Sequence, residues 1–135
     1  MENKINNLVA EWDDVYKKGQ LSLWILLAIF EGRKYAAQIS EFMQDATGGN
    51  FEVKEQSLYR ALRRFSAMGL VAIIMQDSPH GGPKRKYYEL TTEGKEVLGR
   101  FIALNITPML SPPINQLLKT AAWSENHEST EQTTT

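Results

Sequence analysis

Residues 54–94 carry the clearest structural signal in the chain and read KEQSLYRALRRFSAMGLVAIIMQDSPHGGPKRKYYELTTEG. Its first part predicts an amphipathic helix that ends at Gly69, because apolar residues recur there at helical spacing. One face of this helix is apolar and consists of Leu58, Ala61, Leu62 and Phe65. The opposite face carries Gln56, Arg60, Arg63 and Ala67, with Tyr59 and Arg64 at its flanks. We therefore expect one face to pack into a core and the other to form a stripe of guanidinium groups.

The residues that follow predict an antiparallel β-hairpin with a positively charged tip. Residues 70–76 are rich in β-branched side chains, and residues 86–90 alternate between polar and apolar, as strands do. The loop between them contains His80 and leads into three basic residues, Lys84, Arg85 and Lys86. A basic helix followed directly by such a hairpin is typical of a winged helix-turn-helix, in which both elements meet DNA.

The residues before this stretch predict three helices. Residues 3–18 place apolar side chains at helical spacing and are expected to form an amphipathic helix that stops at Gly19. Residues 20–31 are apolar on nearly all sides, which is typical of a buried central helix, and Gly32 ends them. Residues 35–46 repeat the helical period until a glycine-rich segment breaks it. We expect this third helix to be the first helix of the helix-turn-helix pair.

The residues after the hairpin predict a further helix and then an interruption. Thr91 is a suitable N-cap, and Glu93 lies in the first turn, where the helix dipole favours an anion. An apolar stripe continues to about Asn105 through Val97, Leu98, Phe101, Ile102 and Leu104. Prolines then interrupt the pattern, and a short helix is expected over residues 114–122. Residues 124–135 contain no hydrophobic side chain and are expected to be disordered.

Length and charge indicate one small domain with its positive charge in the middle. The chain has 135 residues and a net charge of −1, and this length fits a single domain. Residues 33–100 carry eleven basic and eight acidic residues, a balance of +3, while residues 1–32 and 101–135 each come to −2. The concentration of positive charge in the middle of the chain favours a polyanionic partner.

Several classes of function are disfavoured by what the sequence lacks. It has no cysteine, which excludes disulfides, thiolate nucleophiles and cysteine-ligated metal sites. His80 and His127 have no neighbouring ligand set, and no catalytic motif or phosphate-binding glycine loop appears. We therefore expect no metal, no cofactor and no enzymatic activity. With no signal peptide and no apolar run longer than residues 23–30, we expect a soluble cytoplasmic protein.

From about residue 21 to residue 100 the sequence resembles the PadR family of bacterial winged-helix transcriptional regulators. The resemblance is carried by Gly48-Gly49, Ser57-Leu58-Tyr59, residues 61–64, Gly69-Leu70-Val71, residues 81–91 and Gly94. The combination of Leu-Tyr in the basic helix with Tyr-Tyr-x-Leu-Thr-x-x-Gly after a glycine-proline turn is specific.

This resemblance implies a mainly helical fold with a small β-hairpin, of the short-tailed type that dimerises through its terminal helices. The expected organisation has four parts. A dimerisation helix spans residues 1–19, and a winged helix-turn-helix DNA-binding domain spans residues 20–94. Carboxy-terminal dimerisation helices span residues 95–123, and a disordered tail follows over residues 124–135.

The functional hypothesis is a homodimeric, sequence-specific regulator of transcription, most simply a repressor that a ligand or signal releases from a pseudo-palindromic DNA site. Arginine pairs bidentately with phosphate or guanine edges, and no acidic residue lies three or four positions after the arginines of the basic helix. The expected DNA contacts are Lys54, Gln56, Ser57, Tyr59, Arg60, Arg63, Arg64, His80, Lys84, Arg85 and Lys86.

These assignments have simpler alternatives. A run of charge is usually only a solvated face, and Tyr59 fits either a core-flanking role or a DNA contact. Trp12, Trp24 and Phe101 are most simply packing residues, while the resemblance implies for some members an aromatic pocket at the dimer interface that accepts a planar hydrophobic effector. The alternative function is a winged-helix protein-interaction or small-molecule-sensing module without specific DNA binding. The cationic hairpin tip favours DNA, because three basic residues have little use on a purely protein-facing surface.

Overall fold

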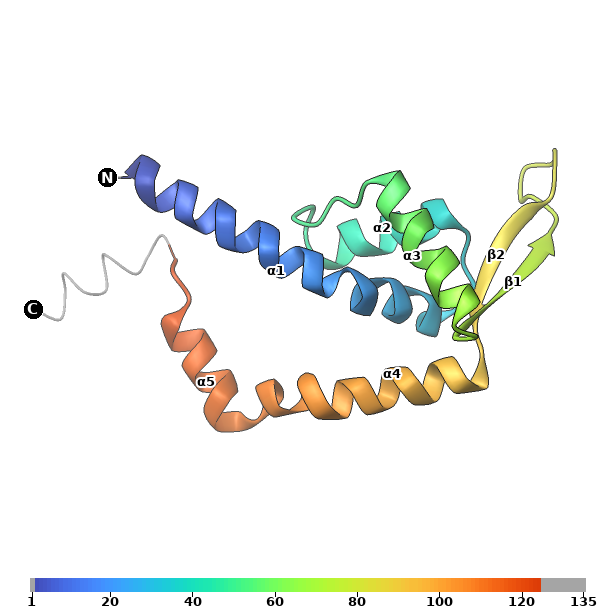
Figure 1. Ribbon diagram of the computed structural model, residues 1–135. Helices are drawn as coiled ribbons and strands as arrows, with labels where there is room; N and C mark the ends of the chain where they lie inside the picture. The colour runs from blue at the N-terminus through green and yellow to red at the C-terminus, as the bar shows by residue number, and fades with distance from the viewer. Residues whose placement is uncertain (1, 125–135) are drawn as a thin grey trace, which may run out of the picture. The chain divides into compact units, whose positions relative to one another are not determined.

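The structure, a computed structural model, describes residues 2–124 and divides into two compact units with the boundary between Leu98 and Gly99 (Figure 1). The first unit contains α1 (Glu2–Glu31), α2 (Ala36–Ala46), α3 (Glu55–Ala67), β1 (Val71–Gln76), β2 (Arg85–Leu90) and the start of α4 (Thr92–Asn105). The second unit contains the rest of α4, the short 3-10 helix η1 (Thr107–Leu110) and α5 (Pro112–Ala121). The predicted fold class, mainly helical with a small β-hairpin, is confirmed.

Two further expectations concern the carboxy-terminal tail and membrane-spanning segments. The tail that we expected to be disordered lies, from residue 125 onward, outside the described residues. None of the described helices is long and apolar enough to cross a membrane.

Helix α1 is continuous, so the prediction that a helix would stop at Gly19 is wrong. An interior glycine costs only about 1 kcal/mol relative to alanine, and interactions on both sides of it offset that cost. Before it lie two i,i+4 ion pairs, Lys17 with Asp13 at 2.8 Å and Lys18 with Asp14 at 3.0 Å, which stabilise a helix. After it, the helix is anchored in the core by Ile25, Leu26, Ala28 and Ile29. The exposed amino-terminal half and the buried carboxy-terminal half therefore belong to one helix.

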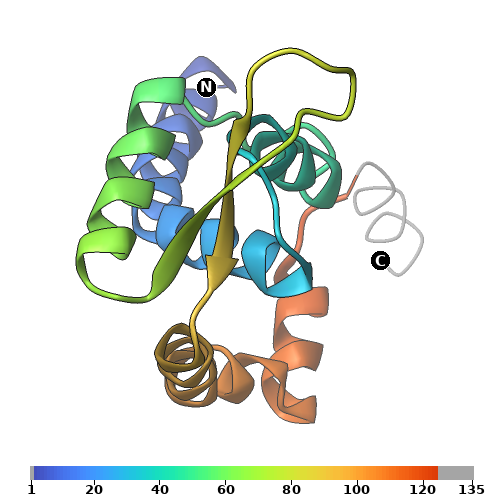
Figure 2. The ribbon, with the colours of Figure 1, turned by 90° about the vertical axis from the view of Figure 1, so that its right-hand side faces the viewer.

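The core of the first unit lies where α1, α2, α3 and the hairpin meet. The apolar face predicted for α3 is buried there, as expected. Figure 2 shows α3 in green beside the hairpin, with α1 behind them. The largest fully buried side chains come from all three helices and are Ile25, Ile39, Met43, Leu58 and Leu62. Because these contacts use the apolar face of α3, its basic face is turned outward.

The hairpin is attached to the helices through the linker between α1 and α2. Its strands pair in an antiparallel register with Val71 opposite Leu90. Lys34, in the linker, joins the other edge of β2: its amide donates to the Tyr88 carbonyl at 3.2 Å, and the Tyr88 amide donates to the Lys34 carbonyl at 2.8 Å. This two-bond bridge ties the middle of the hairpin to the helical core.

Gly69 ends α3, and Gly94 allows the first turn of α4 to pack closely against Leu70. Gly69 has a left-handed φ of 78°, and the Leu70 amide donates to the Phe65 carbonyl at 3.0 Å, as in a Schellman C-cap. Thr91 caps α4 as predicted, because its Oγ1 accepts from the Gly94 amide at 3.0 Å and donates to the Gly69 carbonyl at 2.7 Å. A Cβ at Gly94 would lie 2.1 Å from the Leu70 carbonyl oxygen, so only glycine fits at this contact.

In the second unit, α5 begins earlier than predicted. Pro112 and Pro113 are the first two residues of the helix, so the prediction that they precede it is wrong. The first amide groups of a helix have no intrahelical acceptor, and the fixed φ of proline suits these positions. Much of the apolar surface of this unit is exposed, including Leu104, Leu110, Leu117 and Trp123.

Candidate nucleic-acid interface

The outward face of α3 brings together the polar and basic residues predicted for it. Gln56, Arg60 and Arg63 are exposed along this face. With Glu55 and Tyr59 they line a shallow depression. The side chains of Arg60 and Arg63 form no hydrogen bond or ion pair with any other described residue. Both guanidinium groups are therefore available to an external partner.

The first turn of α3 is not closed by a capping side chain. Lys54 occupies the N-cap position, and its side chain makes no capping hydrogen bond. A serine, threonine or aspartate there would stabilise the helix by about 1 kcal/mol. Glu55 compensates in part, because a carboxylate in the first turn interacts favourably with the helix dipole. The Leu58 amide, bonded to the Lys54 carbonyl at 3.0 Å, holds the backbone of this turn.

Ser57 and Arg64 lie on other sides of α3. Ser57 is half-buried and lines a hollow between α3 and α1. The Arg64 Nη2 donates to the Ser22 Oγ of α1 at 3.1 Å, and the guanidinium lies over the Phe65 ring at 5.2 Å. Arg64 is thus engaged within the protein, whereas Ser57 only lines the hollow, and the DNA contacts of both residues stay a prediction.

A cluster of tyrosines joins α3 to the hairpin and to the start of α2. Burial and the neighbouring Tyr59 raise the pKa of Tyr88, and Arg63 partly opposes this shift. The Tyr88 hydroxyl is therefore protonated at neutral pH. The surrounding pocket extends the α3 surface toward the hairpin and is lined by Tyr35, Ala36, Ala37, Tyr59, Arg85, Lys86 and Tyr88.

The three basic residues of the hairpin differ in how they are held. The Arg85 guanidinium lies over the Tyr35 ring at 4.4 Å, and Tyr35 itself meets Tyr87 edge to face with centroids 5.4 Å apart. Such stacking orients a guanidinium and contributes about 0.5–1 kcal/mol at an exposed site. Lys84 and Lys86 are exposed, and a lysine ammonium is a compact point charge on a flexible stem.

Two glycines shape the tip of the hairpin, and Arg33 holds its strands through hydrogen bonds. Gly81 and Gly82 have left-handed φ values of 80° and 88°, which glycine adopts without strain, and His80 before them is exposed. Arg33 forms hydrogen bonds with two side chains of the hairpin. Its Nη1 donates to Gln76 Oε1 at 3.0 Å, and its Nη2 donates to Glu89 Oε1 at 3.3 Å. No local sequence pattern reveals Arg33, because these partners are 43 and 56 residues away in the sequence.

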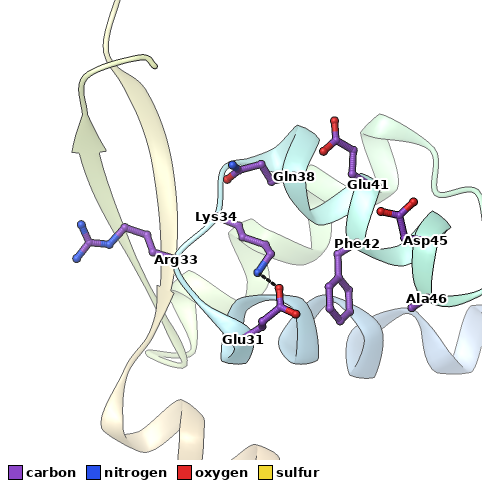
Figure 3. Close-up of a pocket in the computed structure, with 8 residues that line it drawn as sticks. All are labelled: Glu31, Arg33, Lys34, Gln38, Glu41, Phe42, Asp45 and Ala46. Carbon is purple, nitrogen blue, oxygen red and sulfur yellow. Dashed lines mark hydrogen bonds and ion pairs between the residues drawn. The ribbon is translucent and has the colours of Figure 1, made fainter. Parts of the chain in front are cut away.

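A separate hollow lies between the end of α1 and α2 (Figure 3). The Lys34 Nζ donates to Glu31 Oε1 at 2.8 Å and to the Ala28 carbonyl at 2.7 Å, where its charge complements the carboxy-terminal end of α1. Figure 3 shows Arg33 pointing the opposite way, toward the hairpin. The hollow has an acidic rim that disfavours phosphate, formed by Glu41 and Asp45. Within residues 2–124, no three acidic or histidine side chains are grouped in a way that could hold a metal ion.

The aromatic residues considered for an effector pocket are spread over both units. Trp12 is 76% exposed, whereas Trp24 is half-buried and its Nε1 has no hydrogen-bond partner among the described residues. The two tryptophans are separated by about 18 Å along the axis of α1, too far for one small planar molecule to touch both within a protomer. Phe101 belongs to the second unit and is exposed.

Comparison with known proteins identifies the family. Residues 25–100 match the transcriptional regulator PadR-like family. An uncharacterised protein of Lysinibacillus sphaericus is 33% identical over 85 residues, which are 63% of this chain and 77% of that protein.

Solved structures of such regulators share the fold. A PadR-like transcriptional regulator from Bacillus cereus is 35% identical, with a TM-score of 0.61, and the match covers 75% of this chain and 93% of that one. Bacillus subtilis PadR in complex with operator DNA is 21% identical, with a TM-score of 0.54, and the match covers 61% of this chain and 46% of that one. The matched residues 25–100 contain the helix pair, the hairpin and the exposed arginines of α3, and the chain therefore belongs to the PadR-like family of transcriptional regulators.

Proposed function

We propose that this protein is a homodimeric, sequence-specific DNA-binding repressor that a small molecule or another signal releases from its operator. The observation that carries the proposal is the row of Gln56, Arg60 and Arg63 on α3, close to the cationic hairpin within one compact unit. Unpaired guanidinium groups on an exposed helix face are suited to bidentate bonds with guanine or phosphate. A role on chromosomal DNA places the protein in the cytoplasm.

In this proposal α3 and the hairpin have different tasks. Gln56 and Arg60 lie in the first turns of α3, the part of a recognition helix that reaches base edges. Lys84 and Lys86 are exposed on the hairpin and bind phosphates, which adds affinity without reading sequence. Tyr59 lies between the two elements and contacts the DNA backbone there.

Family membership supports the regulatory role. Bacillus subtilis PadR has been solved in complex with operator DNA, and 46% of that chain shares the fold of this one. At 21% identity that likeness concerns the fold alone, so the assignment of individual contacts rests on the exposed side chains described above.

The proposed dimer follows from apolar surface that one chain leaves uncovered. The amino-terminal half of α1 exposes a stripe of six large apolar side chains, each at least 53% exposed: Ile5, Leu8, Val9, Trp12, Val15 and Tyr16. The second unit exposes further apolar side chains on α4 and α5. Soluble monomers rarely leave such continuous apolar patches uncovered, and a second copy related by a two-fold axis would cover them.

A two-fold dimer has a direct consequence for the operator. Two copies of α3 related by the axis would enter successive major grooves, so the DNA site would be a pseudo-palindrome. Its half-sites would lie about 10 base pairs apart, or a multiple of that spacing. A planar hydrophobic effector bound among aromatic residues at the dimer interface would favour another spacing of the two helices and so release the DNA. The candidates for this contact are Trp12, Trp24 and Phe101.

The proposal is tested by footprinting the full-length protein on the DNA upstream of its own gene. We expect one protected region with dyad symmetry, and we expect Arg60→Ala to need about 5- to 150-fold more protein for the same protection. If folded wild-type protein protects no region on a scan of this DNA and binds random duplexes equally well, the proposed function is wrong. A protein-interaction module is then the better description.

A further inference from the structure

Lys17 connects α1 to the loop that leads into α3. Its Nζ pairs with Asp13 on the same helix at 2.8 Å. The same Nζ also donates a hydrogen bond to the carbonyl oxygen of Asn50, across the gap between α1 and the loop. The ammonium group lies 6.0 Å from the centroid of the Phe51 ring. One lysine thus holds two consecutive residues of the loop against α1.

The neighbouring Lys18 provides a comparison within the same helix. It forms an equivalent i,i+4 ion pair, with Asp14 at 3.0 Å. Its side chain is 76% exposed, whereas that of Lys17 is 29% exposed. Lys18 makes no hydrogen bond to the loop within the described part of the chain. The two lysines therefore have the same charge and the same local helix pairing, and they differ in the contact with the loop.

The loop held by Lys17 determines how α3 begins. Phe51 is buried, and its amide donates to the Thr47 Oγ1 at 3.0 Å. Three residues later comes Lys54, the N-cap of α3, which supplies no capping side chain. The position of the first turn, with Gln56 in it, therefore depends on the loop rather than on a local cap.

Helix α1 holds α3 near both of its ends. At the start, Lys17 binds the loop, and Lys17 and Ser57 line the same hollow between the two helices. Toward the end, Arg64 donates to the Ser22 Oγ at 3.1 Å. Because α1 is continuous from Glu2 to Glu31, its exposed apolar stripe and these two contacts belong to one helix.

We infer that Lys17 is a positioning residue for the recognition helix, which fixes the first turn of α3 against α1 and so sets the placement of Gln56 and Arg60 on DNA. The inference rests on the proposed function, because the placement matters only where these side chains read bases. Without the contact, the first turn frays, and ordering it again costs free energy when specific DNA binds. Random DNA, which needs no fixed side-chain placement, is affected less.

The experiment compares three variants of the full-length protein. Lys17→Met keeps the apolar stem and removes the charge, Lys17→Arg keeps both the charge and a donor, and Lys18→Met is the matched control. Hydrogen exchange of residues 47–58 reports the loop directly. Binding to the footprinted site and to a random duplex reports specificity, and thermal unfolding reports stability.

For Lys17→Met we expect hydrogen exchange of residues 47–58 to become about fivefold faster. The ratio of affinities for specific and random DNA should also fall about fivefold. Each change corresponds to the loss of one helix cap. Lys18→Met should leave both unchanged, and Lys17→Arg should restore most of each. Equal exchange in Lys17→Met and Lys18→Met would overturn the inference, as would faster exchange with an unchanged binding ratio. If the wild type itself does not discriminate between the two duplexes, the proposed function fails, and exchange alone still decides whether Lys17 holds the loop.

Discussion

Replacing Arg60 and Lys84 by alanine, one at a time, separates base reading from phosphate binding on the proposed surface. The Arg60 side chain forms no hydrogen bond or ion pair with the described residues, so Arg60→Ala breaks none among them, and we assign a loss of binding to a lost DNA contact. A bidentate arginine contact to guanine contributes about 1–3 kcal/mol. That range corresponds to about a 5- to 150-fold loss of affinity for the specific site, with a much smaller loss on random DNA.

Lys84→Ala should behave differently because the side chain lies on the hairpin and is exposed. A lost phosphate contact weakens specific and random DNA nearly alike and lowers the slope of log K against log salt by about one unit per contact. The assay is a fluorescence anisotropy titration of both duplexes at several salt concentrations. Lys18→Ala, which removes one positive charge from α1, serves as the control for net charge.

Two different outcomes of these titrations would overturn the assigned roles of Arg60 and Lys84. If Arg60→Ala leaves the specific-to-random ratio unchanged while Lys84→Ala collapses it, the roles of α3 and the hairpin are reversed. If neither substitution changes binding, this surface does not bind DNA.

Three further predictions concern assembly, packing and pH. Light scattering at micromolar concentration should give twice the monomer mass, and Trp12→Glu, in the exposed stripe of α1, should shift it toward the monomer; a monomeric wild type would contradict the dimer. Gly94→Ala should lower the free energy of unfolding by about 1–3 kcal/mol through overpacking against the Leu70 carbonyl. In Gly99→Ala, whose added Cβ meets nothing within 4 Å, thermal unfolding should show equal or higher stability. The raised pKa of Tyr88 means that the folded state holds the hydroxyl proton more tightly than the unfolded state. The contribution of this proton to stability is therefore present below about pH 10 and is lost above it. Tyr88→Phe should lessen the alkaline fall in melting temperature.

The sequence predicted α3 and the hairpin well because both depend on local patterns. The helical spacing of Leu58 and Leu62 and the stop at Gly69 lie within one short continuous segment, and burial in the structure follows the predicted face. The cap at Thr91 was likewise found from its own position and that of Glu93.

Two predictions were wrong because local signals were given more weight than tertiary context. Gly19 resembles a helix stop, but the ion pairs before it and the buried residues after it stabilise a continuous α1. Pro112 and Pro113 resemble a break, yet proline is compatible with the first turn of a helix.

Contacts between distant parts of the chain could not be predicted from a single sequence. Lys17 with Asn50, Arg64 with Ser22, and Lys34 with Tyr88 join residues separated by at least 33 positions. Periodicity carries no information on such pairs. These contacts nevertheless decide how α3 and the hairpin are held, and therefore which side of each is available to a partner.

Selection of bound sequences from a pool of random DNA duplexes by the full-length wild-type protein shows whether paired recognition helices read an operator. We expect enrichment of a pseudo-palindrome whose half-sites lie about 10 base pairs apart or a multiple of that. The same selection by Arg60→Ala should lose the enrichment at defined positions in both half-sites. Recovery of no common sequence, or of asymmetric single half-sites only, would contradict the claim that paired recognition helices read an operator.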